Sequence, residues 1–231
     1  MRIVLLQSRT DPEHITEERE NFERVIGDAA KLECISTLDE KLAWTSPAEL
    51  LQGVSGVMLG GSADFDFHGG RPEGDPVRLA SMVILARAQN IVSYALTVNL
   101  PILGVCFGHQ LIAEMYGGRI HNDKTQGKFG PHRVLLTEAA LTDPLFSHLP
   151  QSFVAQYAHK DSVTVLPRGA TLLGTGPSCR FSALRYGPKL YTVQFHPESR
   201  QPIPPEFNSQ EAKRIPSLWI EHIVRRGDDE I

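Results

Sequence analysis

The chain has 231 residues, enough for one α/β domain with a substantial core, and its 41% apolar content excludes a mainly disordered protein. The formal net charge of −4 at pH 7 leaves no basic field of the kind that binds nucleic acid. Three scattered cysteines exclude a disulfide framework and a CxxC zinc site, so we expect a reducing, cytoplasmic location. No apolar run approaches the roughly 18 residues of a membrane span, and the N-terminal run is too short for a secretion signal, so we expect neither a membrane partner nor export.

Apolar runs and helical spacing alternate through the first half of the chain. We predict, in order, a strand at 3–6, a helix at 16–30, strands at 32–35 and 54–59, a helix at 77–98, a strand at 102–105 and a helix at 110–116. The acidic run 16–20 is predicted to be a solvated helix face, and the stretch 60–76, rich in Gly, Asp and Pro, a loop. Strands that alternate with helices predict a largely parallel, doubly wound sheet.

Short strand-like segments dominate after His121. We predict strands at 134–136, 153–157, 163–166, 171–175, 181–186 and 190–195, then a helix at 217–225 that buries Leu218, Trp219 and Ile223. The stretch 200–208 contains three prolines and is predicted to be a surface connection. The predicted fold is therefore a single α/β domain over residues 1–231, with a mostly parallel central sheet flanked by helices and an added antiparallel edge.

A cysteine lies at the junction of a predicted strand and a predicted helix. Cys106 is flanked by Gly104 and Gly108, a spacing typical of a nucleophile elbow, where side chains at those two positions would collide. The carboxyl ends of strands are where open α/β sheets bind ligands, and a following helix N-terminus favours a thiolate. A buried, unreactive cysteine is the alternative interpretation.

A histidine and a glutamate, two positions apart, follow the last predicted strand. Side chains at i and i+2 of an extended chain point the same way, so His196 and Glu198 are expected to share a face. His196 would then take the thiol proton of Cys106, and Glu198 would orient the imidazole. Alone, the pair would be ordinary surface chemistry, but beside a cysteine elbow it predicts a Cys-His-Glu catalytic set.

These motifs resemble those of the class I, or triad-type, glutamine amidotransferases. The matching segments are Gly104-Val-Cys106-Phe-Gly-His-Gln110 and Gln194-Phe-His196-Pro-Glu198, in the expected order, with the histidine 90 positions after the cysteine. The segment 111–118 is similar to a helix in the amidotransferase domains of GMP synthase and anthranilate synthase, and 157–163 is similar to a stretch of GMP synthase. The resemblance covers the whole chain and implies the flavodoxin-like α/β fold of that family, here as a free-standing domain.

The resemblance also implies a reaction and a set of site residues. Cys106 would attack the side-chain amide carbon of glutamine, His196 would protonate the departing ammonia, and water would release glutamate from the γ-glutamyl thioester. The implied oxyanion-hole donors are the backbone N–H groups of Phe107 and Gly61, although the Gly60-Gly61 pair alone would also suit an ordinary turn. The implied substrate contacts are Gly60, Gln110, Tyr157 and His159. No metal or cofactor is implied.

Three functions remain open at this stage. The chain shows no P-loop and no ATP-pyrophosphatase motif, so ammonia released by an amidotransferase would pass to a separate synthase subunit. One alternative is a stand-alone γ-glutamyl peptidase that uses the same thioester, and the other is a catalytically silent regulatory subunit. Such a silent protein would have no chemical need for the cysteine, the histidine and the glutamate together.

Two further groups near these motifs have simpler interpretations. Asp64, Asp66 and His68 alternate in the loop after Gly61 and could hold a metal, but a solvated loop that lines or covers the active site is favoured. His109 lies beside the nucleophile on the predicted helix, poorly placed to reach the thiol, and is expected to have a supporting role.

Overall fold

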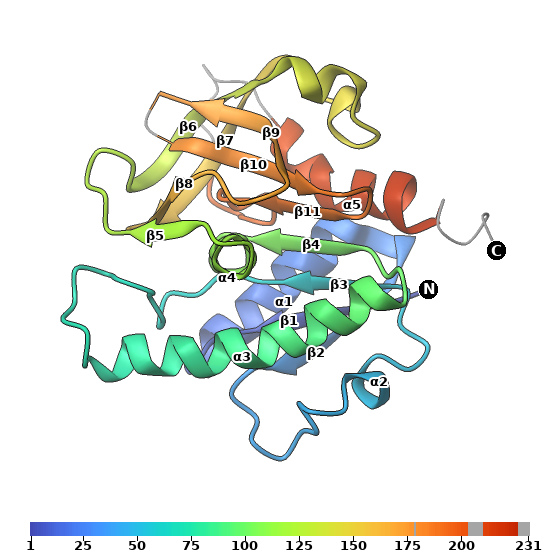
Figure 1. The fold of residues 1–231 in the computed structure, drawn as a ribbon. Coiled ribbons are helices and arrows are strands. Elements are labelled where there is room, and N and C mark those ends of the chain that lie inside the picture. Colours follow the sequence, from blue (N-terminus) through green and yellow to red (C-terminus); the bar gives the residue numbers. More distant parts are fainter. Residues whose placement is uncertain (178, 203–209, 226–231) are drawn as a thin grey trace.

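One nine-stranded mixed sheet runs through the computed structural model, which describes residues 1–177, 179–202 and 210–225 (Figure 1). Its strands are β1 (Arg2–Gln7), β2 (Lys31–Ser36), β3 (Gly56–Leu59), β4 (Ile102–Val105), β6 (Lys128–Leu136), β7 (Ser152–His159), β9 (Ala170–Gly176), β10 (Cys179–Tyr186) and β11 (Leu190–Val193). Their order across the sheet is β2-β1-β3-β4-β11-β10-β9-β6-β7. β5 (Arg119–His121) and β8 (Ser162–Val165) form a separate two-stranded antiparallel ribbon.

Five neighbouring strands are parallel, and helices cover both of their faces. β2, β1, β3, β4 and β11 run in the same direction. α1 (Pro12–Ile26) and α5 (Ile215–Trp219) belong to one core cluster, around Phe22 and Trp219. α3 (Pro76–Thr97) and α4 (Phe107–Met115) belong to a second cluster on the other face, around Ile84 and Ile112 (Figure 1). This arrangement confirms the predicted doubly wound α/β fold.

Capping residues fix the first residues of the two longest helices. The side chain of Asp11 accepts hydrogen bonds from backbone N–H groups in the first turn of α1, and Pro12 is the first helical residue. α3 begins in the same way with Asp75 and Pro76. The helix predicted at 16–30 therefore begins four residues earlier, at a cap that hydrophobic spacing alone does not reveal.

Helix α3 is, among the described residues, long and apolar enough to cross a membrane by length and composition alone. In this fold, its stripe of Ile84, Ala88 and Ile91 is buried in the core that covers the sheet. The opposite face exposes Leu79 and Val83 to about half of their surface. The helix therefore serves as the outer layer of the domain, with an unusually apolar outer face.

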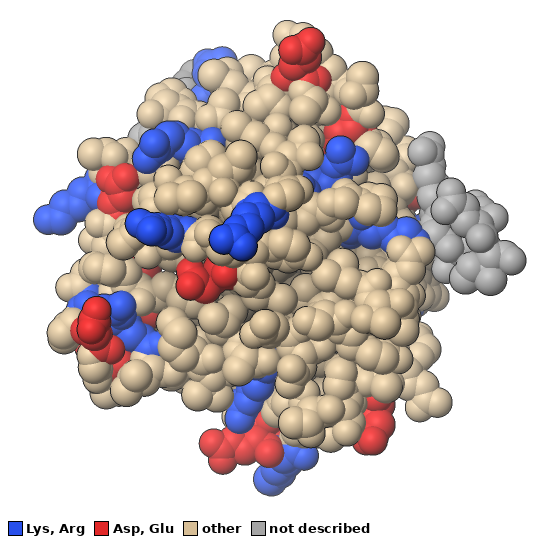
Figure 2. All heavy atoms as spheres, in the orientation of Figure 1, with Lys and Arg blue, Asp and Glu red and all other residues tan. Residues whose placement is uncertain are grey.

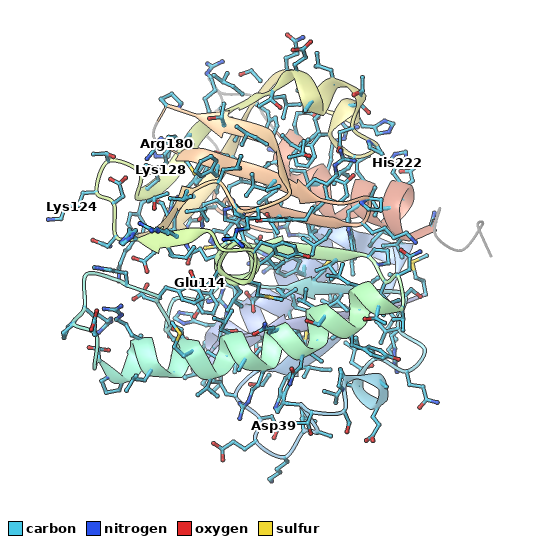
Figure 3. All side chains as sticks on the ribbon, viewed as in Figure 1. Asp39, Glu114, Lys124, Lys128, Arg180 and His222 are labelled. Carbon is cyan, nitrogen blue, oxygen red and sulfur yellow. The ribbon has the colours of Figure 1, made fainter. Side chains whose placement is uncertain are left out.

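The second half of the chain adds the antiparallel part of the sheet. β10, β9, β6 and β7 pair antiparallel, which confirms the predicted edge. β6 begins six residues before the strand predicted at 134–136, although it contains Pro131. Pro131 pairs with β7 alone, because the pairing of β6 with β9 starts at Leu135, so no hydrogen bond to β9 is lost at this position. Lys128 at the start of β6 and Arg180 on β10 lie at the same end of the sheet (Figure 3).

The remaining elements are short. The predicted helix at 217–225 is present as α5 followed by a π-helical turn, and it buries Trp219 completely. The ribbon strand β5 was not predicted. Most of the predicted surface connection at 200–208 lies outside the described residues. The short helices are η1 (Gly27–Ala29), α2 (Pro47–Leu50), η2 (Glu138–Thr142), η3 (Phe146–His148), η5 (Glu211–Arg214) and η6 (Ile220–Val224).

Charged side chains of both signs are interspersed over the face of the molecule shown in Figure 2. The whole chain carries 23 Lys and Arg residues against 27 Asp and Glu residues. Mixed charge of this kind is typical of a surface that does not attract a polyanion.

Candidate active site

Cys106 lies in a strained turn between β4 and α4. Its φ of +51° and ψ of −99° place it in a region that residues with a side chain rarely adopt. A Cβ at Gly108 would collide with the Leu59 carbonyl oxygen, and one at Gly104 would lie 2.9 Å from the Gly108 carbonyl oxygen. The tight turn therefore requires both glycines, and the backbone has the strand-to-helix geometry that the spacing of Gly104, Cys106 and Gly108 predicts.

The parallel pairing of β11 with β4 brings His196 toward Cys106, because the chain leaves both strands at the same edge of the sheet (Figure 1). His196 Nδ1 donates a hydrogen bond to Glu198 Oε1 at 2.7 Å. β11 ends at Val193, and the two residues lie in a turn that the Ser199 N–H closes on the His196 carbonyl at 3.3 Å. The pair therefore forms as expected, but through a turn and not through the alternation of an extended strand.

The second ring nitrogen of His196 is free for the thiol. Nε2 is buried and makes no ordinary hydrogen bond to a described residue, while contact with Cys106 is among the causes that raise the pKa of His196. The His196 ring carbon Cε1 lies 2.9 Å from the position that a Cβ on Gly61 would take, and the Cys106 Cβ lies 3.5 Å from it. The two side chains are therefore close to each other, beside Gly61. Burial lowers the pKa of His196, but the charges of a Cys106 thiolate and of Glu198 outweigh it and raise this pKa well above its usual value. This environment favours the imidazolium form of His196.

Cys106 opens into a cleft, called here the nucleophile cleft. Its lining includes residues of the loop 62–66, the start of α4 and the segment 158–161. Gln110, a predicted substrate contact, lies in its wall, and its Nε2 donates to the Asp161 carbonyl at 2.8 Å. Gln194 Nε2 donates to Cys106 Sγ at 3.7 Å. The sequence analysis does not predict Gln194 as a site residue. Its position two residues before His196, in the same motif, was the available signal.

The other predicted substrate contacts divide between the cleft and the surrounding structure. His159 lines the nucleophile cleft, and burial lowers its pKa to about 4, so the ring is neutral near pH 7. Tyr157 is almost fully buried, and its hydroxyl donates to Ser182 Oγ at 2.9 Å. The Gly60 carbonyl accepts from the Gly108 N–H at 3.0 Å, which ties the loop after β3 to the elbow. Of these three, His159 lines the nucleophile cleft.

The two predicted oxyanion-hole donors are placed differently. Phe107 begins α4 directly after Cys106, where backbone N–H groups have no intrahelical acceptor, and it lines the nucleophile cleft. The Gly61 N–H instead donates to Glu18 Oε1 at 3.0 Å. In this structure the Gly61 N–H is therefore already used by a carboxylate.

The prediction that the acidic run on α1 is a solvated face is wrong at Glu18. This residue is 3% exposed, and its carboxylate accepts from Gln7 Nε2 at 3.1 Å and from Arg9 Nη2 at 2.9 Å. Glu18 stands four and eight positions before the buried Phe22 and Ile26, so it lies on the stripe of α1 that faces the sheet. That spacing was the available signal, and its acidic neighbours concealed it.

The side chains of the loop that follows Gly61 are held by other contacts. The Asp64 carboxylate accepts from the Thr10 N–H at 2.7 Å, and Asp66 forms a salt bridge with Arg71 at 3.5 Å. Within the described ranges, no three His, Cys, Asp or Glu side chains, His68 included, are grouped to hold a metal ion. Several loop residues, Asp66 among them, form one wall of the nucleophile cleft, the role that the sequence favoured.

His109 is packed behind the elbow. It is fully buried, and its Nδ1 is hydrogen-bonded to Thr192 Oγ1 at 2.8 Å. Burial lowers its pKa to about 3, so the ring stays neutral. A neutral ring bonded to β11 suits a supporting role and not that of the base.

Comparison with known proteins decides the family. The family model described as Glutamine amidotransferase class-I matches residues 76–203, more than half of the chain and the part that contains Cys106, His196 and Glu198. The chain belongs to this family. A glutamine-hydrolysing GMP synthase subunit from Methanocaldococcus jannaschii is 32% identical over 160 residues, which cover 67% of this chain and 71% of the relative. The Archaeoglobus fulgidus counterpart is 30% identical over 155 residues, 67% of this chain and 72% of the relative.

Solved structures share the class I amidotransferase fold of the chain. A Thermoplasma acidophilum protein described as a candidate GMP synthase subunit superimposes with a TM-score of 0.74 at 21% identity, over 100% of this chain and 97% of that one. A glutamine amidotransferase from Thermotoga maritima gives 0.62 at 21% identity, over 99% and 92%. These likenesses confirm the fold that the resemblance implied.

Exchange of Glu198 for glutamine should weaken catalysis by this class I amidotransferase and narrow its pH range. Glu198→Gln removes a charge that raises the pKa of His196, so the imidazolium should lose its proton at lower pH. We expect kcat/KM to fall on the order of 10²- to 10⁴-fold and the alkaline limb of the pH–rate profile to move to lower pH. Steady-state rates across the pH range measure both effects. Glu33→Gln, at a surface salt bridge with Arg2, is the matched control, and an unmoved alkaline limb would argue against the assignment.

Proposed function

We propose that this chain hydrolyses the side-chain amide of glutamine through a γ-glutamyl thioester on Cys106. The observation that carries the proposal is the strained Cys106 turn, open to the nucleophile cleft and flanked by His196, whose other nitrogen is held by Glu198 at 2.7 Å. Membership of the class I glutamine amidotransferase family supports glutamine as the amide donor.

The proposed reaction has two halves. Cys106 Sγ, its proton transferred to His196, bonds to the amide carbon of glutamine, and the carbonyl electron pair moves to oxygen. Return of that pair breaks the carbon–nitrogen bond, and His196 supplies the proton with which ammonia departs. His196 then takes a proton from water, which attacks the thioester and releases glutamate and the thiol. These steps require no metal or cofactor, because Cys106, His196 and Glu198 carry every proton and electron pair.

We also propose that the ammonia passes to a separate synthase subunit. The relatives from Methanocaldococcus jannaschii and Archaeoglobus fulgidus are each named as one subunit of a GMP synthase, which supports a partner that accepts ammonia. A cytoplasmic location belongs to the same proposal, since the substrate and the partner would be found there.

Glutamate release from L-glutamine tests the proposal, with γ-glutamyl dipeptides and glutathione assayed in parallel and the Cys106→Ala variant as the blank. Turnover of glutamine above the blank is the expected result. A preference for the peptides would instead identify a γ-glutamyl peptidase. A catalytically silent protein is indicated if neither glutamine nor the γ-glutamyl peptides are hydrolysed and a thiol-reactive glutamine analogue fails to label Cys106.

A further inference from the structure

Arg9 lies where two clefts meet. A second cleft, called here the helix cleft, lies against α1. Its lining includes Glu17 and Asn21 of that helix and residues of the segments 156–158 and 198–201. Arg9, Ala158 and His196 line both the helix cleft and the nucleophile cleft. Arg9 also follows β1, so it stands at the same carboxyl edge of the sheet as the elbow. A nearly buried cation, 12% exposed in its side chain, is thus placed beside the proposed base and nucleophile.

Glu18 fixes the position of Arg9. Arg9 Nη2 donates to Glu18 Oε1 at 2.9 Å, and the Glu18 side chain is 1% exposed. The same carboxylate accepts from Gln7 Nε2 and from the Gly61 N–H, so three donors satisfy it. Burial lowers the pKa of Arg9, but the charge of Glu18 outweighs it and the pKa is raised, so the guanidinium stays charged. The pair is therefore a rigid, desolvated unit of the active site.

Arg9 has donor groups left for a ligand. A guanidinium carries five N–H bonds, and Arg9 Nε is buried without a partner among the described residues. Arg9 Nη2 and Cys106 Cβ each lie 3.5 Å from the position that a Cβ on Gly61 would take, so they are at most about 7 Å apart. This span is short enough for a guanidinium to approach an oxygen on a carbon bonded to Cys106 Sγ.

We propose that Arg9 is a catalytic residue that stabilises negative charge on the Cys106 thiolate and on the oxyanion, and that Glu18 is its positioning residue. Arg9 would act in place of the Gly61 N–H, which Glu18 holds, and together with the Phe107 N–H. As the carbon–sulfur bond forms, Arg9 donates hydrogen bonds to the new oxyanion and keeps its own protons. The inference rests on the proposed function, because an oxyanion arises only if Cys106 attacks an amide.

The alternative role of Arg9, binding the α-carboxylate of glutamine, fits its location less well. In glutamine the α-carboxylate carbon is four bonds away from the amide carbon that reacts. Arg9 Nη2 and Cys106 Cβ both lie beside Gly61, the glycine that the family resemblance implies as an oxyanion-hole donor. Lys160 offers a second cation elsewhere in the lining of the nucleophile cleft. We therefore assign Arg9 to the charge that develops during the reaction.

The test compares Arg9→Gln and Glu18→Gln with the control Glu20→Gln. Glu20 lies on α1, as Glu18 does, and forms an exposed salt bridge with Arg200. Two readouts are used, the kinetics with L-glutamine and the pH dependence of Cys106 alkylation by iodoacetamide. Arg9→Gln should lower kcat about 10²- to 10³-fold, with KM changed by less than about threefold. Its alkylation profile should move to higher pH, because the thiolate loses a neighbouring cation. Glu18→Gln should act in the same direction, and Glu20→Gln should match the wild type.

Three results would overturn this assignment. A raised KM with an unchanged kcat in Arg9→Gln would show that Arg9 binds the substrate carboxylate. A higher kcat in Glu18→Gln would show that Glu18 withholds the Gly61 N–H from the reaction. An alkylation profile of Arg9→Gln identical to the wild type would remove the electrostatic role. If Arg9→Gln does not fold, as its melting temperature will show, Glu18→Gln decides. If the wild type fails to exceed Cys106→Ala with glutamine, the proposed function fails, and the alkylation profiles still test Arg9.

Discussion

Alanine in place of Cys106 should leave no glutamine hydrolysis above the uncatalysed background. The proposed reaction forms and breaks a bond to Sγ, so its loss should lower kcat on the order of 10⁴- to 10⁶-fold. The fold should persist, because the change removes one atom from a turn that Gly104 and Gly108 already shape. A coupled assay for glutamate measures the rate, and the melting temperature confirms that the variant is folded.

Cys34→Ala is the matched control for this experiment. Cys34 lies on β2, is half-buried and lines neither cleft, so the variant should hydrolyse glutamine at the wild-type rate. Burial raises the pKa of Cys34 to about 11, so this thiol should not compete for iodoacetamide near neutral pH. Alkylation should therefore label Cys106 in the wild type and in Cys34→Ala. Glutamine turnover that persists in Cys106→Ala would refute the thioester.

The elbow could be predicted because its constraint is local. A cysteine with glycines two positions before and after it leaves few structures other than a tight strand-to-helix turn, and the positive φ of Cys106 bears this out. The parallel half of the sheet was predictable for a similar reason, since buried strands such as β4 consist of continuous apolar runs. Where short-range sterics and burial determine the local structure, a single sequence is sufficient to predict it.

The pairing of strands that are far apart in the sequence is harder to predict than local structure. The strand β11 comes from the C-terminal half of the chain but pairs with β4, between the parallel and the antiparallel strands, and that register sets His196 near Cys106. The early start of β6 also depends on pairing, because Pro131 is tolerated where β9 does not reach. The residues of β11 and β6 do not by themselves reveal these pairings, so the sequence predicts that the two strands exist but not where they begin and end.

The pair of Arg9 and Glu18 shows why the sequence also missed part of the candidate site. Both residues lie in polar surroundings in the sequence, where charge normally indicates solvent. Burial of Glu18 becomes favourable once Arg9, Gln7 and the Gly61 N–H surround it, and these donors come from β1 and from the loops after β1 and β3. A buried charge of this kind can be recognised only when its partners are placed in space.

Alanine at Gly108 should destabilise the domain and disable the site together. The new Cβ would meet the carbonyl oxygen of Leu59 closer than real Cβ atoms approach any atom, and backbone at the end of β3 cannot move aside as a flexible side chain would. Relief of the clash must separate α4 from β3 and break the bond from the Gly108 N–H to the Gly60 carbonyl, 3.0 Å long. We expect a loss of about 1 to 3 kcal/mol or more in the free energy of unfolding, measured by urea denaturation.

Gly74→Ala separates this effect from the general cost of replacing a glycine. No atom lies within 4 Å of the position that its Cβ would take, and its φ is not in the left-handed region, so its stability should change by less than about 0.5 kcal/mol. In Gly108→Ala, displacement of Gly60 and Gly61 should also shift the contacts of Glu18, so glutamine hydrolysis should fall further than the folded fraction accounts for. If the folded fraction of Gly108→Ala retained full activity, the close approach of α4 to the loop after β3 would not be needed for catalysis, and the elbow would be a structural feature alone.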